Sequence, residues 1–179
     1  MLWLDEIKIR QASRPDIGKV SSVLAEAAQW AEDRGMPMWR NDELTSEHIA
    51  RDVTAGYFFL AECAGEVAGT IKFQLQDPLF WSDTPEGEAA FVHRLAIRRT
   101  YSGGQLSNLL LKWAVDRAAA LGRRYLRLDC EADRPRLRAV YERFGFRHHS
   151  DRRVGPYFVS RYELPLGTGR RPDDLMQEK

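Results

Sequence analysis

Two adjacent glycines in Ser102-Gly103-Gly104-Gln105 are the residues whose types and spacing most directly indicate chemistry. They follow an apolar segment that ends at Ile97 and precede a long amphipathic run, so they predict a turn that opens a helix. The first N–H groups of a helix lack intrahelical partners and carry partial positive charge, and glycine lets an anion approach them. With Arg98 and Arg99 nearby, the turn predicts a site for a phosphorylated ligand.

Three other phosphate-binding patterns compete with this interpretation. A Walker loop requires G-x-x-x-x-G-K-[ST], and a dinucleotide fingerprint requires G-x-G-x-x-G near the first strand. The sequence contains neither pattern. Ser-Gly-Gly-Gln also occurs in the signature of transporter ATPases, but without a Walker loop that match is a coincidence. The turn therefore indicates a phosphate site of another kind.

The flanking segments predict the elements that must position this turn. Strands show alternating apolar residues, and helices show apolar residues at a spacing of three to four. Ser13 caps the first helix, and an Ala-Gly turn joins the second and third strands into a hairpin. The predicted strands are 7–12, 57–63, 66–74, 88–97, 125–130, 146–149 and 157–163, and the predicted helices are 13–35, 46–55, 106–122 and 135–145.

This order, β-α-α-β-β-β-α-β-α-β-β, favours an α/β layer architecture with a mixed central sheet. A polar loop over residues 76–87 carries Phe80 and Trp81. Aromatic residues on a loop either line a pocket or pin the loop to the core, and the sequence leaves both alternatives open.

Composition excludes several classes of protein. The chain has 179 residues, 44% of them hydrophobic, which suits one globular domain. No apolar run approaches the roughly 18 residues of a membrane span, and Asp5 and Glu6 come too early for a signal peptide. Cys63 and Cys130 are isolated, so we expect buried reduced thiols, no metal site and a cytoplasmic protein.

Charge is divided between the two halves of the chain. Residues 1–90 carry 8 Lys and Arg against 16 Asp and Glu, a net charge of −8, whereas residues 91–179 carry 19 against 10, a net charge of +9. A basic half suits an anionic cofactor and an acidic half suits a cationic substrate, although an uneven solvated surface would give the same count.

One family resemblance uses more of the chain than the phosphate patterns do. Leu95-Ala96-Ile97 followed by a Tyr-x-Gly turn resembles the acetyl-CoA motif of the GNAT family of N-acetyltransferases. Tyr141-Glu142-Arg143-Phe144-Gly145-Phe146 resembles its second signature, and Leu128-Asp129-Cys130 is similar to a strand ending in some bacterial members. The resemblance spans about Ile7 to Glu163. It implies a GNAT acyl-CoA N-acyltransferase fold with helices on both faces of a mixed sheet, in a single domain over residues 1–166 and a polar tail over 167–179.

The resemblance also implies acetyl-CoA as co-substrate. Backbone groups of Leu95, Ala96 and Ile97 would hold the pantetheine arm and the acetyl oxygen. The family's pyrophosphate turn reads Gln/Arg-x-x-Gly-x-Gly/Ala, and this chain differs from it at all three defined places. Arg134 stands where the family commonly has asparagine. The implied cofactor-binding set is completed by Ser102, Gly103, Gly104, Gln105, Leu106, Ser107 and Arg134.

Direct acyl transfer to an amine needs a base for the amine and an acid for the leaving thiolate. Tyr141 matches the family's tyrosine and is the candidate acid, unless it only packs on its helix face. His93 is the candidate base because it shares a strand face with Ile97 and an imidazole exchanges protons near neutral pH. It could instead be a partly buried strand histidine, and Glu86 and Glu88 are alternative bases.

These features predict an acetyl-CoA-dependent N-acetyltransferase that acts on a primary amine of a small molecule or a protein. Acidic residues of the first half would attract the ammonium group, and the side chains of Trp30, Trp39, Phe80 and Trp81 would wall the acceptor site. A non-catalytic acyl-CoA-binding or regulatory module is the alternative, motivated by the altered turn. A nucleic-acid binder is disfavoured because acids are interspersed among the arginines. We expect no membrane partner, and the resemblance leaves a homodimer open.

Overall fold

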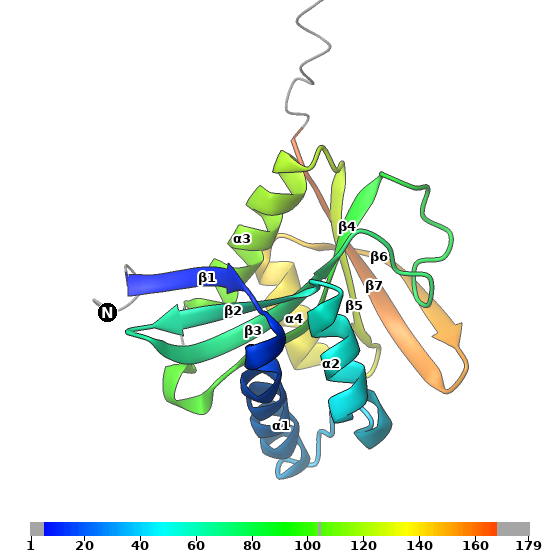
Figure 1. Cartoon of the computed structure of the whole chain (residues 1–179). Helices are drawn as coiled ribbons and strands as arrows, with labels where there is room; N and C mark the ends of the chain where they lie inside the picture. The colour runs from blue at the N-terminus through cyan, green and yellow to red at the C-terminus, as the bar shows by residue number, and fades with distance from the viewer. Residues whose placement is uncertain (1–5, 104, 168–179) are drawn as a thin grey trace, which may run out of the picture. The chain divides into compact units, whose positions relative to one another are not determined.

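The computed structural model describes residues 6–103 and 105–167. Its helices and strands follow one another in the order that the sequence predicts, so that prediction is confirmed (Figure 1). The elements are β1 (Ile7–Gln11), α1 (Ile17–Glu32), α2 (Ser46–Thr54), β2 (Phe58–Cys63), β3 (Glu66–Gln74), β4 (Ala89–Ile97), α3 (Leu106–Ala120), β5 (Tyr125–Glu131), α4 (Pro135–Phe144), β6 (Arg147–Val154) and β7 (Tyr157–Pro165).

The strands form a seven-stranded sheet in the order β1-β2-β3-β4-β5-β7-β6. Strands β4 and β5 are parallel, whereas β1 and β2, β2 and β3, β5 and β7, and β6 and β7 pair antiparallel, so the sheet is mixed as predicted. Contacts divide the chain into two compact units. Among the described residues, unit 1 comprises 6–73 and 94–111, and unit 2 comprises 74–93 and 112–167. Within the described residues, no helix combines the length and apolar character that crossing a membrane requires.

Unit 1 is organised around the hairpin of β2 and β3. Ala64 and Gly65 both have positive φ, +50° and +84°, which is the backbone of a tight two-residue hairpin turn. Helices α1 and α2 place their apolar stripes against this hairpin. The shared core consists of Ala12, Val20, Val23, Leu24, Ala27, Ile49, Val53, Phe58, Leu60, Val67 and Ala96.

Unit 2 is organised around β5, β7 and β6. The antiparallel register of β5 and β7 runs from Tyr125 opposite Pro165 to Glu131 opposite Val159. The loop between β3 and β4 is held against the core by Trp81, which is only 2% exposed. The centre of its ring lies 6.0 Å from the centre of the Phe91 ring. Trp81 is thus a core residue, and the expectation that it walls an acceptor site is wrong.

The parallel pairing of β4 and β5 is short. It joins Ala89–Phe91 to Tyr125–Arg127 and ends there, although both strands continue. His93 and Asp129 each lie two residues past the last pair, Phe91 opposite Arg127, so alternation brings their side chains to the same face. Backbone geometry changes directly after His93, where Arg94 has a φ of +51°.

Candidate functional site

Asp77 enters the site from the loop that follows β3, and its carboxylate is held by its own loop. Oδ1 accepts hydrogen bonds from the backbone N–H of Leu79 (3.1 Å) and of Phe80 (2.9 Å). This is the local side-chain turn that Asp favours at the start of a loop. The side chain is 5% exposed. With Oδ1 fixed by two donors, Oδ2 is the oxygen that faces His93.

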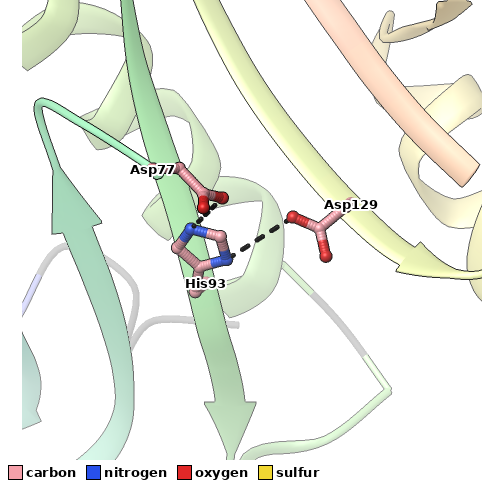
Figure 2. A group of neighbouring side chains, drawn as sticks. All are labelled: Asp77, His93 and Asp129. Atoms are coloured by element: carbon pink, nitrogen blue, oxygen red, sulfur yellow. Dashed lines mark ion pairs between the residues drawn. The ribbon is translucent and has the colours of Figure 1, made fainter. Parts of the chain in front are cut away.

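His93 lies between two carboxylates (Figure 2). Its Nε2 is 3.2 Å from Oδ2 of Asp77, and its Nδ1 is 3.7 Å from Oδ1 of Asp129. The closer contact has the distance of an ion pair, and Oδ2 of Asp77 has no other hydrogen-bond partner among the described residues. Each ring nitrogen therefore faces a different carboxylate.

The electrostatics of this cluster favour a charged Asp77. Burial opposes ionisation, but the contact with His93 and the N–H groups of Phe80 and Leu79 outweigh it, so the pKa of Asp77 lies below its ordinary value. One donor atom each from Asp77, His93 and Asp129 lies within 4.8 Å of the others, so the set could hold a metal ion. A metal takes only one imidazole nitrogen at a time, whereas here both nitrogens face carboxylates.

Tyr141 lies on α4 and is partly buried. Burial raises the pKa of its hydroxyl well above the ordinary value, and the nearby Cys130 and the negative charge of Asp129 raise it further. Its ring packs at 6.1 Å from Phe146 and 6.3 Å from Tyr162, so the packing role considered from the sequence is also present. Asp129 thus influences both His93 and the Tyr141 hydroxyl.

In unit 1, the glycine turn borders a cavity of about 180 Å³. Five residues expected to bind the cofactor line it together with Arg99, namely Ile97, Ser102, Gly103, Leu106 and Ser107. Gly103 has a φ of +88°, and the space where a Cβ would stand is open to at least 4 Å. Gly104 falls outside the described residues.

The remaining residues of the expected cofactor set have other surroundings. The carbonyl of Gln105 accepts a hydrogen bond from Leu109 N–H (2.8 Å), so Gln105 caps α3. Leu95 is partly buried on β4, while Ala96 is 4% exposed and belongs to the core of unit 1. Arg134 belongs to unit 2, where it precedes α4 and forms an ion pair with Glu131 at 3.0 Å.

Two adjacent arginines near the turn differ in their contacts. The Arg98 guanidinium forms an ion pair with Glu26 (2.7 Å) and donates a hydrogen bond to the Ser22 hydroxyl (3.0 Å). Arg99 is among the residues that line the cavity, and its guanidinium lies 4.2 Å from the centre of the Trp30 ring. Of the pair, Arg99 is therefore the one that lines the cavity.

Other sequence candidates can now be located. Glu88 forms an ion pair with Arg127 at 3.1 Å, which reduces its availability as a base, whereas Glu86 is exposed. His148 and His149 are exposed. Both cysteines are buried thiols, also as expected.

Sequence reasoning missed Asp77 as a functional residue and left Asp129 without a role. Asp77 precedes Pro78 and reads as an ordinary loop residue. Asp129 had a signal, because it is an acid within the otherwise apolar Leu128-Asp129-Cys130 strand ending. A partly buried acid at the end of a parallel strand is a candidate for a functional group once the neighbouring strand is known.

Comparison with known proteins gives a consistent result. The family model described as the acetyltransferase (GNAT) family matches residues 24–146, which is more than half of the chain. A curated relative, the uncharacterized N-acetyltransferase YesJ of Bacillus subtilis, is 28% identical over 139 residues, covering 73% of this chain and 76% of the relative.

Solved structures share the fold. A GNAT-family acetyltransferase from Listeria monocytogenes superimposes with a TM-score of 0.73 at 23% identity, covering 88% of this chain and 95% of that one. The PaiA N-acetyltransferase of Thermoplasma acidophilum, solved with coenzyme A, gives 0.68 at 16% identity, covering 88% and 99%. The α/β fold class expected from the sequence, with its mixed central sheet, is confirmed.

Proposed function

The chain belongs to the acetyltransferase (GNAT) family, and from this premise we propose that it transfers an acetyl group from acetyl-CoA directly to a primary amine. The observation that carries the proposal is the arrangement around Asp129. The candidate base His93 lies 3.7 Å from this carboxylate, and its charge acts on the hydroxyl of the candidate acid Tyr141. Two buried thiols, Cys63 and Cys130, suit the reducing cytoplasm in which we expect the protein to work.

In this proposal His93 removes a proton from the acceptor amine. Contact with the ionised Asp77 favours a proton on Nε2, which leaves the lone pair of Nδ1 to accept the proton of the amine. The imidazolium that forms has a carboxylate beside each nitrogen, so its positive charge is stabilised where it arises.

Tyr141 donates a proton to the departing sulfur in this proposal. Its raised pKa keeps the hydroxyl protonated at neutral pH, as a general acid must be before the step. Among residues 6–103 and 105–167 no group forms a hydrogen bond with this hydroxyl, so donation to a ligand would not break an internal contact.

We propose that the cavity beside α3 takes the phosphates of acetyl-CoA, whose thioester supplies the acetyl group. The open space next to Gly103 admits an anion to the start of the helix, and Arg99 supplies a positive side chain. The N–H and the hydroxyl of Ser102 already donate to the carbonyl of Arg99, at 3.1 and 2.7 Å, whereas the backbone N–H of Ser107 is present whatever its side chain. The departures from the family pattern are therefore compatible with cofactor binding.

An assay of thiol release from acetyl-CoA tests the proposal. The panel contains spermidine, lysine, benzylamine, an aminoglycoside and a peptide with a free N-terminus. We expect amine-dependent thiol release with at least one of them, and a melting temperature that rises with acetyl-CoA. A rise in melting temperature without turnover would support the alternative, a non-catalytic acyl-CoA-binding module. If neither effect occurs, both CoA-based proposals are wrong.

A further inference from the structure

We propose that Trp30, Arg34 and Arg99 form a second anion site, beside the cavity at the start of α3, which binds the ribose 3′-phosphate of acetyl-CoA. This inference rests on the proposed function and deepens it by assigning the two phosphate positions of the cofactor separately. Arg34 and Arg99 are the binding residues, and Trp30 is a positioning residue. All three belong to unit 1.

The ring of Trp30, in the last turn of α1, is contacted by two arginine side chains. The guanidinium of Arg34, just after the helix, and that of Arg99, in the turn after β4, each lie 4.2 Å from the centre of this ring. The two guanidinium carbons are therefore at most twice this distance apart. Trp30 is half-buried, whereas both arginines are exposed. One aromatic ring thus holds two solvent-accessible cations close together.

Neither of these guanidiniums is neutralised by an acid. Among the residues that the structure describes, no ion pair includes Arg34 or Arg99. The nearby carboxylate of Glu26 has other partners, because it accepts hydrogen bonds from the Arg98 guanidinium and from the backbone N–H of Arg99, both at 2.7 Å. These contacts hold the pKa of Glu26 below its ordinary value. Two uncompensated positive charges beside one ring repel each other, and a dianion relieves that repulsion.

Most donors of the two guanidiniums are also available to a ligand. Arg34 donates one hydrogen bond, to the carbonyl of Trp30 at 3.3 Å. The Arg99 side chain donates none to the other described residues. A guanidinium carries five N–H donors in a planar fork that matches the oxygens of a phosphate group. The pair therefore offers a phosphate both charge and directed hydrogen bonds.

The position of the pair decides which phosphate it takes. Arg99 lines the cavity at the glycine turn, but Trp30 and Arg34 do not. An anion that contacts both guanidiniums is therefore placed at the border of the cavity or outside it. Acetyl-CoA carries a diphosphate bridge and, on its ribose, a separate phosphate monoester with a charge of about −1.5 to −2 at neutral pH. We assign the diphosphate to the cavity and the monoester to the arginine pair.

Trp30 contributes by holding the two arginines before the ligand arrives. An arginine side chain loses rotamer freedom when it is immobilised against a ligand, and this loss weakens binding. A ring that already contacts both guanidiniums reduces the loss. Phenylalanine would retain a weaker form of the contact, whereas leucine would remove the aromatic face altogether.

The test compares coenzyme A with 3′-dephospho-coenzyme A, which lacks only the monoester, by isothermal titration calorimetry. We expect the wild-type chain to bind coenzyme A about tenfold or more tightly than the dephospho form, because charge-assisted hydrogen bonds are lost. Arg34→Gln should weaken coenzyme A about fivefold or more and change the affinity for the dephospho form by less than about twofold. Arg99→Gln should weaken both ligands, since Arg99 also lines the cavity.

Variants of the ring and a matched control complete the series. Trp30→Phe should keep most of the preference for coenzyme A, and Trp30→Leu should lower it at least about threefold. Arg153→Gln removes an exposed arginine whose guanidinium lies 5.0 Å from the centre of the Phe158 ring in unit 2, and it should leave both affinities unchanged. Melting temperatures without ligand show whether each variant is folded.

The outcomes separate this site from the proposed function. Equal affinity of the wild type for the two ligands would overturn the 3′-phosphate site, while binding of the cofactor would stand. The same would follow if Arg34→Gln weakened both ligands alike or weakened neither. If the wild type bound neither ligand, the proposed function would fail and the site with it.

Discussion

The turn before α3 and the cluster around His93 present their polar groups in different ways. The turn lines a cavity, has an open space at Gly103 and carries Arg99, and the donors expected there are backbone N–H groups at the start of α3. The cluster consists of side chains, and each depends on the next, from the N–H of Phe80 to Asp77 and from Asp77 to His93. A backbone site tolerates substitution, whereas a chain of side-chain contacts does not.

This difference explains why the sequence can depart from the family pattern at the turn. Ser102, Gln105 and Ser107 differ from the usual residues, yet any residue except proline supplies a backbone donor. No such freedom exists at His93, because another side chain would not place an acceptor between two carboxylates. We therefore expect substitutions in the cluster to have larger effects than substitutions in the turn.

The largest expected effect is that of His93→Gln. The amide cannot take up the proton of the amine, so kcat/KM for the amine should fall at least about 100-fold, the usual contribution of a general base. Steady-state kinetics measure this, and the acetyl-CoA-induced rise in melting temperature should remain. A fall of less than threefold would mean that another group, such as Glu86, is the base.

Tyr141→Phe should have the next largest effect. Loss of the hydroxyl removes the proposed acid, and kcat should fall about 10-fold to 100-fold, while the dissociation constant of CoA changes little. The ring contacts with Phe146 and Tyr162 remain, so the melting temperature should stay close to that of the wild type. Equal turnover by the variant would leave Tyr141 with its packing role alone.

The two regions also differed in how well they could be predicted. The turn could be located from sequence because its signals are local: a strand, two glycines and a helix within about fifteen residues. The element order and the Ala64-Gly65 hairpin were predictable for the same reason. Local patterns define elements well, because backbone geometry is set by near neighbours.

The cluster could be predicted only in part. His93 was found from its type and strand, but Asp77 lies sixteen residues earlier, in a loop without periodicity. Its meeting with His93 depends on how that loop folds around its own N–H groups. Asp129 meets His93 because β4 and β5 are neighbours, a fact of strand order that spacing along the chain does not contain. The choice between the two alternatives for Trp81 could not be made from the sequence for the same reason, since its burial depends on contacts distant in sequence, Phe91 among them.

Substitutions in the turn should have intermediate to small effects. Gly103→Ala meets no atom within 4 Å, so its cost is the positive φ, about 1 kcal/mol, and KM for acetyl-CoA should rise about fivefold. Ser107→Gly keeps the backbone donor and should change that KM by no more than about twofold. If Ser107→Gly changed KM more than Gly103→Ala, the side chain rather than the backbone would hold the phosphates.

The smallest expected effect is a pH dependence of stability that comes from Asp77. Because its pKa in the folded protein lies below the ordinary 3.8, protonation favours the unfolded chain. The stabilisation is therefore fully present above about pH 4 and is lost as the pH falls through the lower folded value. Asp77→Asn should unfold at a lower temperature than the wild type at pH 6, and the difference should shrink towards pH 3. Thermal unfolding followed by circular dichroism measures both. Asp116→Asn, which removes an exposed acid paired with Lys112, is the control for the loss of one carboxylate from the surface. A constant difference between wild type and Asp77→Asn across this range would mean that the carboxylate gains nothing from His93 and its loop, and that the cluster is held by packing.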